Sequence, residues 1–167
     1  WAAWQIARAI GKTEQLGLAP LASLQAYYSL VGRDLEHEIA PMLEAEGLGL
    51  MVWSPLAGGF LSGKYRRGQE GEGRRASFDF PPVDKDKGYD AVEVMDDIAA
   101  SHGATVPQVA LAWLLAKPVV STVIIGARKL SQLQDNLGAS DVRLTEEDIA
   151  RLDAAYAPPL QYPGWML

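Results

Sequence analysis

The chain has 167 residues, which is enough for one ordinary domain and too few for two large ones. With 49% hydrophobic and 22% charged residues its composition is that of a globular protein, and a net charge of -6 without a basic stripe argues against a nucleic-acid binder. Cysteine is absent, which excludes disulfides and thiol nucleophiles, and no apolar run of transmembrane length or signal peptide is visible, so we expect a cytoplasmic protein with no membrane partner.

Helices and strands alternate in the first third of the chain. Apolar spacing predicts helices over residues 2–10 and 35–47 and buried strands over residues 21–28 and 48–54. Gly11 should end the first helix, and Pro41 should kink or delay the second, because proline lacks a backbone donor. The helical pattern begins at Trp1 without an initiator methionine, so we expect this sequence to be a piece of a longer polypeptide.

A glycine-rich segment separates this part from the next helices. Residues 62–88 predict a long loop, and loops of that length in compact domains are usually functional or disordered. A third helix should end near Gly103, and capping patterns at Thr105 and Thr145 predict the starts of two more. The tail, residues 157–167, holds three prolines and cannot be helical, but it is apolar and should dock on another surface.

The stretch from Val119 to Asn136 carries the most informative pattern. A β-branched run over residues 119–125 predicts a strand buried on both faces of a parallel sheet, followed by an amphipathic helix. Gly126-Ala127-Arg128 forms the hinge. Glycine permits close approach of a ligand, the helix N-terminus offers N–H groups and arginine matches phosphate, so the hinge predicts a phosphate site. The alternative is that Gly126 makes a tight turn and Arg128 is a solvated charge.

Three buried strands alternating with helices predict an α/β fold with parallel strands and flanking helices. Three such strands alone would leave two open edges and an incompletely covered core. A complete (β/α)8 TIM barrel typically has about 250 residues, so the length fits the later part of a barrel better than the whole. Units of this kind also pack as a doubly wound sheet, so both packings stay open here. In the barrel interpretation, residues 1–167 are a single partial domain, the C-terminal part of a barrel whose N-terminal half is absent.

Three motifs stand at or beyond the ends of the three predicted strands. They are Gln25; Trp53-Ser54-Pro55-Leu56 with Gly58-Gly59; and Ile125-Gly126-Ala127-Arg128 with Gln132 and Asn136. Each motif alone is weak evidence. Together, and in this order, they resemble the aldo-keto reductases over essentially the whole chain, from the helix after the fifth barrel strand to the C-terminus.

The resemblance implies an eight-stranded barrel that binds NADP(H) and reduces aldehydes or ketones, small carbonyl substrates, to alcohols by hydride transfer. It places Gln25 on the nicotinamide carboxamide and Trp53 against the nicotinamide ring. It also implies that the long loop covers the cofactor and that the tail borders the substrate pocket. The remaining implied cofactor-binding residues are Ser54, Pro55, Leu56 and Gly58 along the pyrophosphate and Gly126, Arg128, Gln132 and Asn136 at the adenosine end, with Arg128 on the 2'-phosphate.

The sequence departs from the family pattern in two ways. Lys129-Leu130 replace the usual hydroxyl cap and proline, and because lysine is a poor N-cap the loop there should be looser. The catalytic Asp, Tyr, Lys and His of the family come from the missing half, as does a Ser-Asn pair that grips the nicotinamide. No catalytic residue is therefore assigned to this chain. The alternatives are a nucleotide-sensing subunit of a potassium channel or an inactive fragment, and the oligomeric state is not indicated.

Other polar residues have more ordinary explanations. His37 and His102 lack a second histidine at ligand spacing, so surface or cap roles are expected and no metal site. Neighbouring carboxylates on a helix face different ways, which argues against catalytic pairs at Asp96-Asp97 and at residues 146–148. Ser54 lacks a nucleophile elbow, and Tyr27 and Tyr28 are expected in the wall or core.

Overall fold

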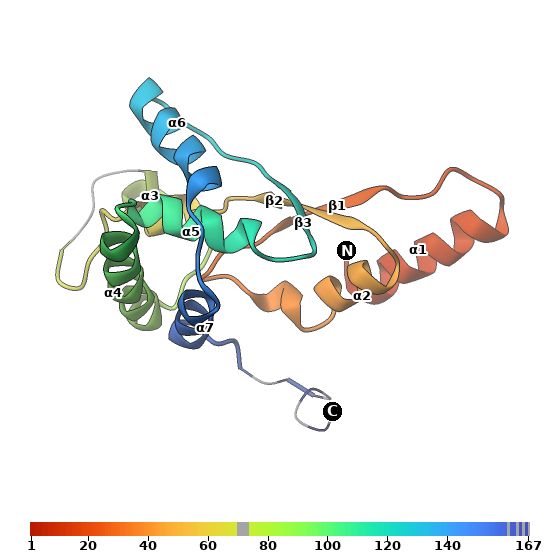
Figure 1. The fold of residues 1–167 in the computed structure, drawn as a ribbon. Coiled ribbons are helices and arrows are strands. Elements are labelled where there is room, and N and C mark those ends of the chain that lie inside the picture. The colour runs from red at the N-terminus through yellow and green to blue at the C-terminus, as the bar shows by residue number, and fades with distance from the viewer. Residues whose placement is uncertain (70–73, 160, 163, 165, 167) are drawn as a thin grey trace.

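The computed structural model describes residues 1–69, 74–159, 161, 162, 164 and 166 (Figure 1). Strands β1 (Ser23–Tyr27), β2 (Gly49–Trp53) and β3 (Val120–Val123) form a parallel sheet in the order β1-β2-β3. The expected α/β architecture, with three parallel strands and flanking helices, is confirmed.

The helices cover one face and the two ends of this sheet. Figure 1 shows α4, α5 and α7 gathered toward one end, α1 and α2 toward the other, and α6 projecting beyond the sheet. The α-helices in the described ranges are α1 (Ala3–Gln15), α2 (Ile39–Ala45), α3 (Arg74–Ser77), α4 (Lys85–His102), α5 (Val106–Leu115), α6 (Leu130–Leu137) and α7 (Glu146–Ala155), with 3-10 turns η1 (Asp34–Glu36), η2 (Ala57–Ser62) and η3 (Gly138–Asp141).

Several element boundaries differ from the sequence-based expectation. The first helix runs through Gly11 to Gln15, because a glycine in an exposed helix costs only about 1 kcal/mol. The second starts late, as the proline suggested, so that Pro41 lies in the first turn of α2, where a backbone donor has no helical partner anyway. The segment 62–88 is less loop-like than predicted, since it contains α3 and the start of α4.

The two faces of the sheet have different environments. Side chains alternate along a strand, and Leu50 and Val52 of β2 are fully buried against the helices while Met51 and Trp53 are only partly buried on the other face. The prediction that β3 is buried on both faces is wrong, because Ser121 and Thr122 are exposed. The strand lies at the edge of the sheet, and no layer of the described chain covers its second face.

The helix α6 is amphipathic as predicted, but its apolar side faces outward. Leu130 is 70% exposed and Leu137 is 58% exposed, whereas Asn136 is buried. The spacing of the leucines thus predicted the helix correctly. It does not show which surface the leucines pack against. Their exposure means that the described chain carries no complementary surface for them.

Both predicted capping boxes are present. Thr105 and Gln108 close the start of α5, and Thr145 and Asp148 close that of α7, each with reciprocal side-chain and backbone bonds. Asp148 also lies 2.8 Å from Nε2 of His102, which joins the end of α4 to the start of α7. Burial opposes ionisation of Asp148, but hydrogen bonds from Thr145 and His102 outweigh it and lower the pKa of this carboxyl.

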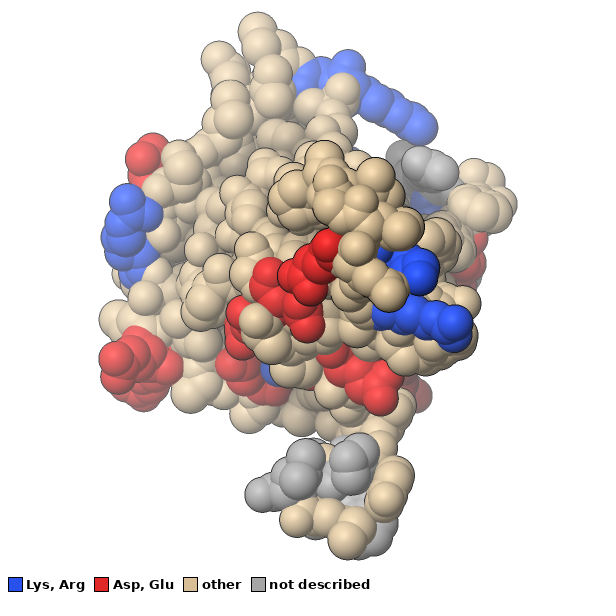
Figure 2. All heavy atoms as spheres, turned by 90° about the vertical axis from the view of Figure 1, so that its right-hand side faces the viewer, with Lys and Arg blue, Asp and Glu red and all other residues tan. Residues whose placement is uncertain are grey.

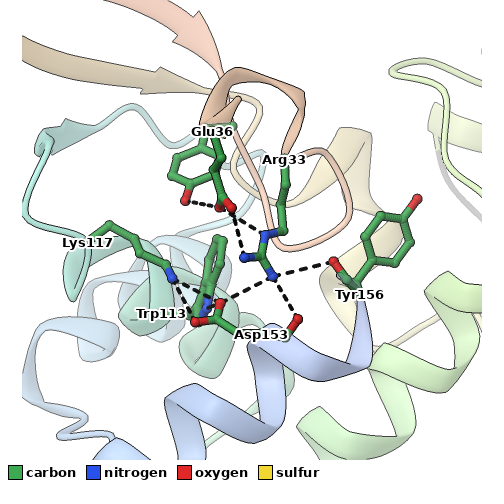
Figure 3. A network of polar contacts seen from close by, with 7 residues as sticks. Arg33, Glu36, Trp113, Lys117, Asp153 and Tyr156 are labelled. Atoms are coloured by element: carbon green, nitrogen blue, oxygen red, sulfur yellow. Dashed lines mark hydrogen bonds and ion pairs between the residues drawn. The ribbon is translucent and has the colours of Figure 1, made fainter. Parts of the chain in front are cut away.

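A second polar cluster fixes the other end of α7 (Figure 3). The buried guanidinium of Arg33 makes a two-point contact with Glu36, at 2.9 Å from Nε and 2.8 Å from Nη2. Its Nη1 donates to the backbone carbonyl of Asp153 at 2.9 Å and lies 3.2 Å from the Asp153 carboxylate. Arg33 therefore supplies donors to the carbonyl groups at the end of α7, which have no partner within the helix.

The indole of Trp113 lies between the two cations of this cluster. Figure 3 shows Lys117 and Arg33 on opposite sides of the ring, at 4.4 Å and 5.3 Å from its centroid. Its Nε1 donates to Asp153 at 3.0 Å, and Lys117 binds the same carboxylate at 2.9 Å. Two positive and two negative side chains are thus balanced in a half-buried site, which joins α5, α7 and the segment after β1.

We expect Arg33→Met to lower the free energy of unfolding by about 3 kcal/mol, because it leaves two carboxylates without their shared partner. Urea denaturation followed by circular dichroism would measure the loss. Arg67→Met is the control, since Arg67 pairs with Asp86 and Asp90 at an exposed position, where ion pairs contribute little. Equal losses in the two variants would contradict the assigned importance of the Arg33 cluster.

Candidate functional site

The three strands end at one edge of the sheet. Tyr27 and Trp53, the last residues of β1 and β2, are register partners, and Val52 pairs with Val123, the last residue of β3. Carboxyl ends of parallel strands are where ligand sites form in sheets and barrels of this class. The segments that carry two of the predicted motifs, beginning at Ser54 and Ile124, therefore leave from the same edge.

The segment after β2 holds an unusual concentration of left-handed backbone. Ser54 has φ 51° and Ala57 has φ 49°, and Gly58 and Gly59 follow with φ 65° and 97°. Residues other than glycine in this region cost about 1–3 kcal/mol each and persist where their surroundings hold them, commonly at ligand sites. The Oγ of Ser54 accepts from the backbone N–H of Gly58 at 3.0 Å, and its carbonyl accepts from Ala57 at 2.8 Å.

Arg75 stabilises this strained loop by a hydrogen bond to its backbone. Its side chain is buried, donates to the carbonyl of Ala57 at 2.8 Å and to that of Pro81 at 2.7 Å, and lies 2.7 Å from the carboxylate of Asp79. The guanidinium also lies over the ring of Phe60. Sequence reasoning missed this residue, because nothing in a glycine-rich run with several arginines distinguishes the one that becomes buried.

Aromatic side chains surround Trp53 on the face of the sheet turned away from the core. Its ring centroid lies 5.2 Å from that of Tyr27, in a tilted arrangement, and 6.2 Å from that of Phe80, nearly parallel at 15°. Tyr27 is half-buried and shares a hydrogen bond of 2.9 Å with Ser29. Burial raises the pKa of Tyr27 despite this bond, so the phenol stays protonated.

Gln25 lies on the same face but not at the strand end. It is the third of the five residues of β1, opposite Met51, and its side chain is exposed. Because side chains two positions apart share a face, Gln25 and Tyr27 point to the same side as Trp53. The structure therefore brings Gln25 and Trp53 to one surface, with Gln25 deeper along the strand than the sequence suggested.

The hinge after β3 is open. Gly126 has no left-handed φ, and a Cβ built there would meet nothing within 4 Å. The backbone conformation at this position therefore does not require a glycine, and the space where a side chain would lie is open. Arg128 is exposed.

Gln132 compensates for the weak cap at Lys129. Its Oε1 accepts from the backbone N–H groups of Arg128 at 3.0 Å and Lys129 at 3.3 Å, so the start of α6 is closed rather than loose. Since that oxygen is occupied, the side-chain amide of Gln132 retains N–H donors for a ligand. Asn136 lies one turn further along α6 and is buried.

The two histidines lie at helix ends, as expected. His102 binds Asp148 at 2.8 Å, and the half-buried His37 caps the end of η1 through its backbone N–H. Among the described residues, no group of three His, Asp or Glu side chains could hold a metal ion. Within the same residues no single helix is long and apolar enough to cross a bilayer, and α4 with α5 meets that test only as a pair bent by 92°.

Two further surfaces lack the features of this edge. A hollow of about 390 Å³ lies along α1, between Trp1, Trp4 and Arg8, but its lining comes from one helix and the residues just before it, with no polar groups converging from other elements. Figure 2 shows the face at the right-hand side of Figure 1, where Lys and Arg form separate groups divided by acidic and uncharged side chains. That face offers no continuous basic surface for a polyanion.

Comparison with known proteins gives a consistent picture. The model of the aldo/keto reductase family matches residues 1–157. An uncharacterized oxidoreductase, YrpG, from Bacillus subtilis is 33% identical over 159 residues, covering 95% of this chain and 48% of that protein. A putative voltage-gated potassium channel subunit beta from Schizosaccharomyces pombe is 37% identical, covering 92% and 47%. Aldo-keto reductase str7 from Strobilurus tenacellus is 33% identical, covering 84% and 48%. The chain spans about half the length of the curated relatives it matches.

The strained loop can be tested at Gly58. A Cβ at this position would collide with the backbone carbonyl of Phe80, in addition to the left-handed φ of 65°. Gly103→Ala is a matched control, because Gly103 has φ 60° with nothing within 4 Å. We expect Gly103→Ala to lower the free energy of unfolding by about 1–2 kcal/mol, and Gly58→Ala by about 1 kcal/mol or more beyond that, measured by urea denaturation. Equal losses would show that the loop does not pack on residue 80.

Proposed function

The chain belongs to the aldo/keto reductase family, and from this premise we propose that it supplies the cofactor-binding part of an NADP(H)-dependent oxidoreductase that reduces aldehydes or ketones to alcohols. The proposal extends to the fold, with the three strands forming the later part of a (β/α)8 barrel. The observation that carries it is the strained, braced loop of residues 54–59 at the edge where the strands end. A cytoplasmic location remains part of this proposal.

The residues at this edge fit a dinucleotide. Trp53 offers a flat aromatic surface, and the exposed amide of Gln25 lies on the same face for the carboxamide of a nicotinamide. Ser54, Pro55, Leu56 and Gly58 form a compact turn whose backbone a pyrophosphate can approach. When bound, NADPH supplies the hydride that reduces the carbonyl carbon. The role of this chain is to hold and orient the nicotinamide ring and to exclude water from the side of the ring that faces Trp53.

The adenosine end would be held at the hinge after β3. Gly126 leaves room, Arg128 is exposed and presents a forked cation, and the amide of Gln132 has donors to spare. Asn136 follows on the same helix. A guanidinium matches the two-point geometry of phosphate, so Arg128 is the proposed partner of the 2'-phosphate.

The proton donor and its partners lie outside this chain in our proposal. Tyr27 is the tyrosine nearest to Trp53 among the described aromatic contacts, but its hydroxyl is engaged with Ser29. We therefore assign it to the wall of the site. The tail, of which residues 160, 163, 165 and 167 lie outside the described structure, is proposed to border the substrate pocket.

A second candidate is a nucleotide-binding subunit that does not turn over a substrate. It is favoured by the similarity to three proteins described as potassium channel beta subunits, at 35–37% identity. Both candidates use the same cofactor edge and differ in whether catalytic residues accompany it. An intact Asp, Tyr, Lys and His set in the polypeptide that contains this chain would favour the reductase.

The first experiment compares this chain with the longer polypeptide encoded by the natural reading frame. We expect the chain alone to bind NADPH but to give no measurable oxidation of it in the presence of aldehydes or ketones, because the catalytic residues are supplied elsewhere. The longer polypeptide should consume NADPH with these substrates. Turnover by the chain alone at a rate similar to that of the longer polypeptide would contradict this division.

The preference of the protein for NADP(H) over NAD(H) tests the proposed role of Arg128 in the hinge after β3. A charge-assisted hydrogen bond contributes about 1.5–3 kcal/mol, so Arg128→Ala should weaken NADP(H) binding by roughly ten-fold or more and leave NAD(H) binding nearly unchanged. Isothermal titration calorimetry measures both affinities. Arg143→Ala is the control, because Arg143 is an exposed arginine that donates to the carbonyl of Ser140 in η3. Equal losses for the two cofactors would contradict the role of Arg128.

A further inference from the structure

The ring of Trp53, proposed above to hold the nicotinamide, is already in contact with an aromatic side chain of the protein. The ring of Phe80 stacks nearly parallel to it, with 15° between the planes and 6.2 Å between the centroids. Tyr27 contacts the same indole in a tilted arrangement at 5.2 Å. A planar ligand ring that stacks on the same face of Trp53 would meet the ring of Phe80.

Phe80 belongs to a short strap, residues 78–81, whose backbone is held firmly. The carbonyl of Pro81 accepts from Arg75 at 2.7 Å, and the carboxylate of Asp79 binds both Arg75 at 2.7 Å and Lys85 at 3.0 Å. The carbonyl of Phe80 lies against Gly58 of the strained loop. The strap is thus anchored to the loop that is proposed to receive the pyrophosphate.

The side chain of Phe80 is held much less firmly than this backbone. It is 45% exposed, and its described ring contacts are with Trp53 and with Phe78, whose centroid lies 5.6 Å away. Rotation about its side-chain bonds would move the ring toward solvent while the anchors at Asp79 and Pro81 stay in place. Such rotations of exposed side chains are fast compared with ligand release.

We propose that Phe80 acts as an internal plug, which occupies the stacking surface of Trp53 in the ligand-free protein and swings out when the nicotinamide ring binds. This inference rests on the proposed cofactor site. It makes Phe80 a residue that sets the affinity for the nicotinamide end of the cofactor and leaves the adenosine end unaffected.

The test uses Phe80→Ala, which removes the plug, and Phe80→Tyr, which keeps a stacking ring. An aromatic pair of this kind corresponds to roughly two- to ten-fold in an equilibrium constant. We expect Phe80→Ala to bind NADPH roughly two- to ten-fold more tightly than the parent chain, and Phe80→Tyr to bind it like the parent. Adenosine 2',5'-bisphosphate, which carries the 2'-phosphate but no nicotinamide, should bind all three proteins equally in calorimetric titrations.

A readout independent of cofactor comes from the indole N–H resonance of Trp53, identified by its loss in Trp53→Phe. Phe80→Ala should shift this resonance in the free protein, since a neighbouring ring current is removed, and NADPH added to the parent should shift it too. An unchanged resonance in Phe80→Ala, or NADPH affinity that stays equal or falls, would overturn the plug while leaving the cofactor site intact. A parent chain that binds neither NADPH nor the bisphosphate would instead contradict the proposed function, and the plug with it.

Discussion

The parallel pairing of three strands is the constraint on which the rest of this structure depends. It sends the segments after β2 and β3 away from one edge and fixes which side chains share a face, so Gln25 and Trp53 meet although they lie on different strands. In the described part of the chain, no helix layer lies over the face of the sheet that carries Met51 and Trp53. The chain spans about half of its relatives' length, and the edge where its strands end carries two of the predicted motifs.

Two arginines stabilise the regions around that rim in different ways. Arg33 brings Glu36 and Asp153 together with the end of α7, and Asp153 in turn binds Trp113 and Lys117, so the start of the tail is held to the segment after β1. Arg75 donates mainly to backbone carbonyls and joins the strained loop to residues 79–81. The first arrangement serves the fold, whereas the second maintains an otherwise unfavourable backbone next to the proposed ligand edge.

Much of the secondary structure could be predicted from interactions between residues close in the sequence. The capping boxes at Thr105 and Thr145, the late start before Pro41 and the alternation of helix and strand follow from neighbouring residues, and the structure confirms them. Burial was not predictable in the same way, because the exposure of Ser121 and Leu130 depends on whether another layer packs on them, and the described residues supply none. The brace of Arg75 and the pairing of Arg33 with Asp153, 120 residues apart, depend on tertiary contacts that no local pattern encodes.

One side chain, that of Gln132, closes the start of α6 and carries a different group for the proposed ligand site. Gln132 satisfies two backbone donors with its oxygen, and its amide group carries two further N–H donors. Glutamate at this position would keep the acceptor and lose the donors, whereas methionine would lose both. The two substitutions therefore separate helix closure from ligand recognition within a single side chain, a distinction that removal of the side chain by alanine would obscure.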